Sequence, residues 1–290
     1  MPTMPIMRHI AVVKDVALPG GRALQARVWP GRGGALVLLH GLFDDSEGWL
    51  ALARGTRRPC IALDLPGFGG SGLPVASTLE AYADDIAAGL DALGLDACTL
   101  VGHSLGGAVA AHVAERSPAV RSLCLLAPAG FGRIPLADLV ARRGVIDLAQ
   151  LALPLGLVNP LTVTAAYATF VAHHRLPTRD LLGRLRRRAF HAAPGVRAAV
   201  EALAASGRDP DGLAHRPLAF AGPVAALWGA RDALVPPDHA DRVAAAAPGA
   251  HVEVWEGMGH HPQRERPRSL ARFVEEHASR AVSAGSATAA

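Results

Sequence analysis

The sequence predicts an α/β fold in which a mostly parallel, eight-stranded sheet is flanked by helices and carries an inserted all-helical segment. Short, continuous apolar runs such as 35–39 and 60–63 are typical of strands buried on both faces of a sheet. They alternate with amphipathic stretches such as 78–93, an order that favours parallel strands joined by right-handed crossovers. From residue 133 to 215 this alternation is replaced by a helical period interrupted by prolines.

The elements can be placed in order along the chain. The first two strands, 8–16 and 22–29, are joined by a Pro-Gly-Gly turn and are expected to form an antiparallel hairpin at the sheet edge. The other strands are expected at 35–39, 60–63, 97–101, 120–126, 224–228 and 251–255, and helices at 49–54, 78–93, 108–115, 237–247 and 262–277. We therefore expect a core formed by 1–132 and 216–280, a helical cap at 133–215, and a disordered tail at 281–290.

The composition narrows the class of function. Half of the 290 residues are hydrophobic, which is typical of a globular chain with a full core. The net charge is only +4, and the densest basic run, 184–188, contains no aromatic residue, so it predicts a solvated helix face and no nucleic-acid partner. The cysteines, Cys60, Cys98 and Cys124, are odd in number and lie in or beside apolar runs, which indicates buried, reduced thiols.

No targeting or membrane segment is expected. The first nine residues lack the apolar stretch of a secretory signal. The uncharged stretch 148–172 is long enough to span a membrane, but Pro154, Gly156 and Pro160 interrupt it, so we expect two short apolar helices. The predicted protein is cytoplasmic, with no membrane span, and is a monomer or a homodimer.

The most informative motif is Gly102-His103-Ser104-Leu105-Gly106, which reads Gly-x-Ser-x-Gly. A β run leads into it and a run of small, helix-forming residues follows, which is the setting of a nucleophile elbow. Such a sharp turn needs small residues two positions before and after the serine. The helix that follows would aim its first amides at a developing oxyanion.

An activated serine needs a general base and a group that orients the base. Ligands bind outside the carboxyl ends of parallel strands, so partners for Ser104 are expected directly after later strands. Asp232 follows the strand at 224–228, and His260 lies in a glycine-rich loop after the strand at 251–255. The order Ser, Asp, His is the one that the elbow motif requires. The adjacent His261 is the alternative base.

With these motifs the chain resembles the α/β-hydrolase superfamily over nearly all of its length except the cap. The stretches that carry the likeness are His40-Gly41, Asp-Leu-Pro-Gly-Phe-Gly at 64–69 with Ser71, Gly-His-Ser-Leu-Gly-Gly at 102–107, Trp228-Gly229 with Asp232 and Val235-Pro236, and 259–267. The resemblance implies a catalytic triad with Ser104 as nucleophile, His260 as base and Asp232 as its orienting group. It also implies an oxyanion hole formed by the backbone amides of Leu42 and Leu105, with no metal or organic cofactor.

Other residues that could carry chemistry are expected to have structural roles. His40 is expected to brace the oxyanion loop, His103 to pack, and Asp64 to hold its own loop. The pair His173-His174 has no patterned carboxylate or cysteine, which favours packing over metal binding. Residues 67–72 match Gly-x-Gly-x-x-Gly, but no helix begins there to bind a pyrophosphate.

The sequence therefore predicts a serine hydrolase that cleaves a carboxylic ester, or a related acyl compound, of a small apolar substrate. The substrate pocket is expected to be lined by His40, Phe43, His103, Leu153, Leu157 and Phe170, beneath the apolar cap. The alternatives are hydrolysis of a carbon–carbon bond in a β-diketone-like substrate, acyl transfer or perhydrolysis, and a small-molecule receptor on the same fold. Leu-Phe-Asp-Asp at 42–45 counts against the first, which often has a glycine-richer loop.

Overall fold

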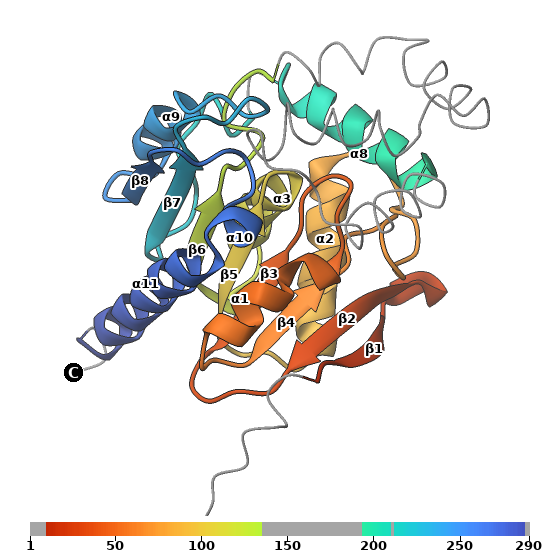
Figure 1. The fold of residues 1–290 in the computed structure, drawn as a ribbon. Helices are drawn as coiled ribbons and strands as arrows, with labels where there is room; N and C mark the ends of the chain where they lie inside the picture. The colour runs from red at the N-terminus through yellow and green to blue at the C-terminus, as the bar shows by residue number, and fades with distance from the viewer. Residues whose placement is uncertain (1–9, 135–192, 210–211, 288–290) are drawn as a thin grey trace, which may run out of the picture.

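The computed structural model describes residues 10–134, 193–209 and 212–287, and its centre is an eight-stranded sheet with helices on both faces (Figure 1). The strand order is β1-β2-β4-β3-β5-β6-β7-β8; β1 and β2 pair antiparallel, β2 and β4 pair antiparallel, and all other pairs are parallel. The strands are β1 (Val12–Ala17), β2 (Ala23–Trp29), β3 (Ala35–Leu39), β4 (Cys60–Leu63), β5 (Cys98–His103), β6 (Val120–Leu126), β7 (Val224–Gly229) and β8 (His251–Trp255). This confirms the predicted fold class.

The continuous apolar strands are explained by two cores, one on each face of the sheet. Alternate residues of β3 point to opposite faces. Leu36 and Leu38 pack with Trp49 and Leu52, next to α1 and α11, whereas Val37 and Leu39 belong to the core under α2, α3 and α9. The helices are α1 (Leu50–Gly55), α2 (Leu79–Ala92), α3 (Leu105–Ala114), α8 (Ala193–Ser206), α9 (His239–Ala246), α10 (Pro262–Glu265) and α11 (Pro267–Ala287).

Some boundaries differ from the prediction for local reasons. The helix expected over 262–277 is broken, because Arg266 precedes a proline and lies outside helical space at φ −138°. The helix after the elbow begins at Leu105 and not at 108, so the paired glycines at 106 and 107 lie inside it. The last helix continues to Ala287, into the segment predicted as a disordered tail from 281, where alanine favours helix.

The three cysteines are free and buried, as predicted. Burial raises the pKa of the Cys60 and Cys98 thiols to about 12, so both stay protonated at neutral pH. Neither is therefore a thiolate nucleophile.

Of the predicted cap, the described residues are 133–134, 193–209 and 212–215. Its helix α8 contacts α2 (Figure 1), and Gly195 approaches the loop after β4 so closely that a Cβ on Gly67 would lie 2.6 Å from the Gly195 Cα. The apolar stretch 148–172 and the pair His173-His174 lie outside the described residues. Within the described residues, no helix combines the length and the apolarity needed to cross a membrane.

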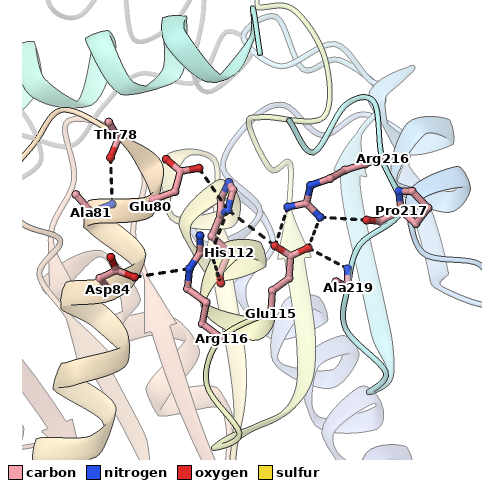
Figure 2. Close-up of polar contacts among 10 residues, drawn as sticks. All are labelled: Thr78, Glu80, Ala81, Asp84, His112, Glu115, Arg116, Arg216, Pro217 and Ala219. Carbon is pink, nitrogen blue, oxygen red and sulfur yellow. Dashed lines mark hydrogen bonds and ion pairs between the residues drawn. The ribbon is translucent and has the colours of Figure 1, made fainter. Parts of the chain in front are cut away.

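An ion pair fastens the chain where it returns from the cap region to the core (Figure 2). Glu115, at the end of α3, bonds both terminal nitrogens of Arg216 and accepts a 2.9 Å hydrogen bond from the Ala219 amide. The Glu115 side chain is only 9% exposed. Burial alone would raise its pKa, but the bonds from Arg216 and Ala219 outweigh burial, and the net pKa is lowered.

We expect Glu115→Gln to lower the free energy of unfolding at pH 7 by about 1–3 kcal/mol, because a charge-assisted bond at a partly buried position is lost. A lowered pKa in the folded state stabilises the fold above the ordinary Glu value of 4.5 and stops doing so as pH falls through the folded-state pKa. Urea unfolding should therefore show a difference between wild type and variant at pH 7 that shrinks in acid.

The matched control is Asp84→Asn, which removes the exposed ion pair of Asp84 with Arg116 at 3.6 Å, also seen in Figure 2. Its expected effect is below about 0.5 kcal/mol. Equal losses of unfolding free energy in the two variants at pH 7 would contradict the stabilising role assigned to Glu115.

Candidate active site

The elbow at Ser104 has the strained geometry that the motif predicts. Ser104 joins β5 to α3 with φ 55° and ψ −118°, a conformation that costs a non-glycine residue free energy. The flanking glycines make the turn possible. A Cβ on Gly102 would lie 2.3 Å from the Gly106 carbonyl oxygen, and one on Gly106 would lie 2.5 Å from the carbonyl oxygens of Leu39 and His40.

The predicted acid and base come together at the ends of β7 and β8. His260 Nδ1 lies 2.7 Å from Asp232 Oδ2, and the two side chains are 3% and 0% exposed. The other carboxylate oxygen of Asp232 accepts from the amides of Leu234 and Val235, each at 2.9 Å. These bonds fix the carboxylate, so Nδ1 of His260 donates to it and Nε2 keeps its lone pair.

His261, the alternative base, has a different setting. Its Nδ1 lies 3.3 Å from the Gln263 side-chain nitrogen, which donates to it. Burial lowers the pKa of His261 well below its ordinary value, and the neighbouring His103 and Arg264 lower it further. Asp232 is hydrogen-bonded to the ring of His260, so the structure favours His260 over His261 as the base.

The predicted oxyanion loop follows β3. His40 Nδ1 donates to the Gly41 carbonyl oxygen at 2.8 Å, and its Nε2 accepts from the Leu65 amide at 2.9 Å, so this ring braces the loop. Phe43 has φ 60°, a second left-handed residue that the sequence did not reveal. Within the described part of the chain the Leu42 amide has no hydrogen-bond partner. Leu105 is the first residue of α3, so its amide precedes the helical hydrogen bonds.

The predicted pocket residues separate into three groups. His40 and His103 are completely buried and both nitrogens of each ring are hydrogen-bonded, so these two rings brace the site and do not line an open pocket, contrary to their predicted pocket role. Phe43 is 46% exposed and is accessible to a ligand. Leu153, Leu157 and Phe170 lie outside the described residues.

One turn of helix, α10, connects the loops of the site. Glu265 accepts from the amides of Gly259 at 3.0 Å and His261 at 3.1 Å, which holds the loop of His260. Arg264 donates to Asp44 Oδ1 at 2.7 Å, which joins α10 to the oxyanion loop. Gln263 reaches His103, beside Ser104, at 3.1 Å. Neither Gln263 nor Arg264 was predicted to take part in the site, although both lie in the stretch 259–267 that resembles the hydrolases.

Three ring nitrogens, from His103, His260 and His261, lie within 4.8 Å of one another, which raises the question of a metal site. However, Nδ1 of His103 and Nδ1 of His261 both accept from the same Gln263 nitrogen, at 3.1 and 3.3 Å. Because these lone pairs already accept hydrogen bonds, the cluster is a hydrogen-bonded assembly as it stands. It does not offer the free ligand set that a metal requires.

A cavity of about 300 Å³ lies beside the loop of Asp232. Arg133, His239 and Arg242 are among its lining residues, whereas Ser104, Asp232 and His260 are not. It is therefore distinct from the apolar pocket predicted above the serine.

Residues 36–273 match the alpha/beta hydrolase family. The chain belongs to this family. An uncharacterized protein of Mycobacterium tuberculosis is 34% identical over 292 residues, which span 92% of this chain and 83% of that protein. This alpha/beta hydrolase is also similar to two solved structures at 28% and 26% identity. One is a membrane phospholipase A described as a bacterial virulence factor, with TM-score 0.73 and coverage of 93% and 86% of the two chains. The other is a thermophilic esterase from Thermogutta terrifontis, with TM-score 0.67 and coverage of 94% and 99%.

We expect Gly106→Ala to lower the stability of this hydrolase by about 1–3 kcal/mol, because the new methyl group would overlap two backbone carbonyls that cannot move freely. The midpoint of urea unfolding measures the change. Gly72→Ala is the control, since its Cβ would meet the Ala23 carbonyl oxygen at an ordinary 3.7 Å. Equal midpoints for the two variants would mean that the elbow is not packed as described.

Proposed function

We propose that this hydrolase cleaves a carboxylic ester through an acyl-enzyme formed on Ser104, with His260 as general base and Asp232 as the group that orients it. The observation that carries the proposal is the 2.7 Å bond between His260 Nδ1 and Asp232, together with the left-handed turn that exposes Ser104 at the end of β5. His260 Nε2 is then the only unassigned nitrogen of that ring, and it is available for the Ser104 proton.

The chemistry follows from these positions. The Ser104 oxygen attacks the ester carbonyl carbon as its proton passes to His260 Nε2. The amides of Leu42 and Leu105 would donate to the tetrahedral oxyanion, each worth about 3 kcal/mol in comparable sites. The imidazolium returns the proton to the leaving alcohol oxygen. Water then repeats the sequence on the acyl-enzyme, which releases the acid and restores the serine.

The two similar solved structures described above, an esterase and a phospholipase A, support an ester as the bond that is cleaved. The exposed Phe43, next to Leu42, supports an apolar group on the substrate near the oxyanion loop. We also propose that residues 133–215 form the cap that covers this site, with Leu153, Leu157 and Phe170 as its apolar lining. The site needs no metal or organic cofactor for this reaction.

Ser104→Ala should lower kcat for p-nitrophenyl esters by at least about 10⁴-fold, since the attacking oxygen is lost while the fold is kept. A fluorophosphonate should label wild type at Ser104 and leave the variant unlabelled, as read by peptide mass. Ser122→Ala is the control, because the hydroxyl of this buried serine in β6 lies 2.8 Å from the Thr99 hydroxyl and not at the elbow. Substantial turnover by Ser104→Ala would refute the assignment.

An apolar pocket predicts that kcat/KM for p-nitrophenyl esters rises as the acyl chain lengthens from acetate, by up to about tenfold for each one to two buried methylene groups, and then falls when the pocket is full. The series should be measured with wild-type protein below KM. A flat or falling profile from the shortest ester would reject the apolar pocket. A labelled but inactive protein would favour carbon–carbon bond hydrolysis, acyl transfer or a receptor role over ester hydrolysis.

A further inference from the structure

A buried chain of hydrogen bonds connects α10 to the loop of His260 by way of the residue next to Ser104. The Gln263 side-chain nitrogen lies 3.1 Å from His103 Nδ1, and His103 Nε2 lies 2.8 Å from the His260 carbonyl oxygen. His103 is 0% exposed and Gln263 is 1% exposed. The rings of His103 and His260 lie with their centroids 4.7 Å apart.

The direction of each bond follows from what the atoms can do. A carbonyl oxygen only accepts, so His103 must carry a proton on Nε2. Burial, with His260 next in importance, lowers the pKa of His103 well below its ordinary value, so the ring is neutral and Nδ1 has no proton. Nδ1 therefore accepts, and the group that faces it must be the NH₂ of the Gln263 amide. The Gln263 NH₂ and the His260 carbonyl oxygen thus both favour the tautomer in which His103 donates to His260.

We propose that Gln263 and His103 position the base, by a relay in which the Gln263 amide fixes the His103 tautomer and His103 holds the His260 backbone. The catalytic consequence of this relay rests on the proposed function, whereas the hydrogen bonds themselves do not. Neither residue touches the reacting atoms, so both are positioning residues. His103 is covalently joined to Ser104, so the relay ties the backbone of the base directly to the residue before the nucleophile.

The free-energy cost of burying the Gln263 amide supports a positioning role for this residue. The Gln263 side-chain oxygen is buried and has no hydrogen-bond partner among the described residues. An unsatisfied buried carbonyl oxygen destabilises a fold, whereas an apolar side chain of the same length would avoid that cost. The amide nitrogen, in contrast, donates to both His103 and His261. Gln263 therefore contributes to the site through the two hydrogen bonds that its amide donates and not through its packing.

The relay itself can be tested without any substrate. Nitrogen-15 correlation spectra of the wild-type histidines should show a neutral His103 with its proton on Nε2, assigned by comparison with His103→Gln. In Gln263→Met, which keeps the side-chain length but has no donor, a share of His103 should move its proton to Nδ1. A wild-type His103 that carries its proton on Nδ1 would overturn the relay, whether or not the variants fold.

The catalytic effect is tested by a double-mutant cycle with p-nitrophenyl esters. Gln263→Met should lower kcat by about 10- to 100-fold with KM changed less than about twofold, because the base is misplaced while binding is kept. His103→Gln should retain most of the activity, since the glutamine NH₂ can donate to the His260 carbonyl without any tautomer to select. In the His103→Gln background, Gln263→Met should then change kcat by less than about threefold, a loss of additivity that simple packing would not give.

The control is His277→Gln. His277 is also a buried histidine, but it lies on α11, outside the loops that form the site. It should leave kcat unchanged within about twofold. Additive losses in the cycle, or an equal loss in His277→Gln, would overturn the positioning role. A wild-type protein without ester turnover or fluorophosphonate labelling would instead count against the proposed function, and the nitrogen spectra would still decide the relay.

Discussion

The close approach of three backbone segments around Ser104 is the constraint on which the rest of the site depends. The end of β3, the end of β5 and the first turn of α3 meet where Gly102 and Gly106 leave no room for a side chain. This contact holds Ser104 in its left-handed turn and brings Gly41, which follows His40, against His103 and Ser104. The strained conformation of Ser104 is maintained because the packed, buried segments on both sides of it leave no alternative backbone path.

Much of this arrangement could be predicted because it depends on local patterns in the sequence. The strand Ala35–Leu39 is apolar at every position because both of its faces are covered, and its boundaries were predicted without error. The elbow and the order of Ser104, Asp232 and His260 follow from the position of polar residues directly after strands. The pairing of Asp232 with His260 was implied by the resemblance, with the adjacent His261 as the alternative, and the structure shows the hydrogen bond from Asp232 on His260.

What the sequence did not reveal depends on contacts between distant segments. The left-handed conformation of Phe43 is not indicated by a glycine at that position. The helix break at Arg266 is indicated only by the proline that follows, because the helical period continues through this position. Gln263 is an ordinary polar residue by composition, and its role appears only where α10 meets His103, 160 positions earlier in the chain. Long-range hydrogen bonds of this kind leave no periodic trace in the sequence.

The distribution of charge in the site follows from the same burial. His103 and His261 are enclosed with His260, and three imidazolium ions could not share so small a volume. Burial lowers the pKa of both accessory rings, so they act as neutral hydrogen-bond partners of fixed polarity, and in the proposed mechanism they leave proton transfer to His260, the ring that Asp232 supports. A positive charge on His103 would oppose the imidazolium that the proposed mechanism forms on His260. A neutral donor that holds only the backbone of His260 gives position without that repulsion, which is why an amide, and not a charged group, suits the end of the relay.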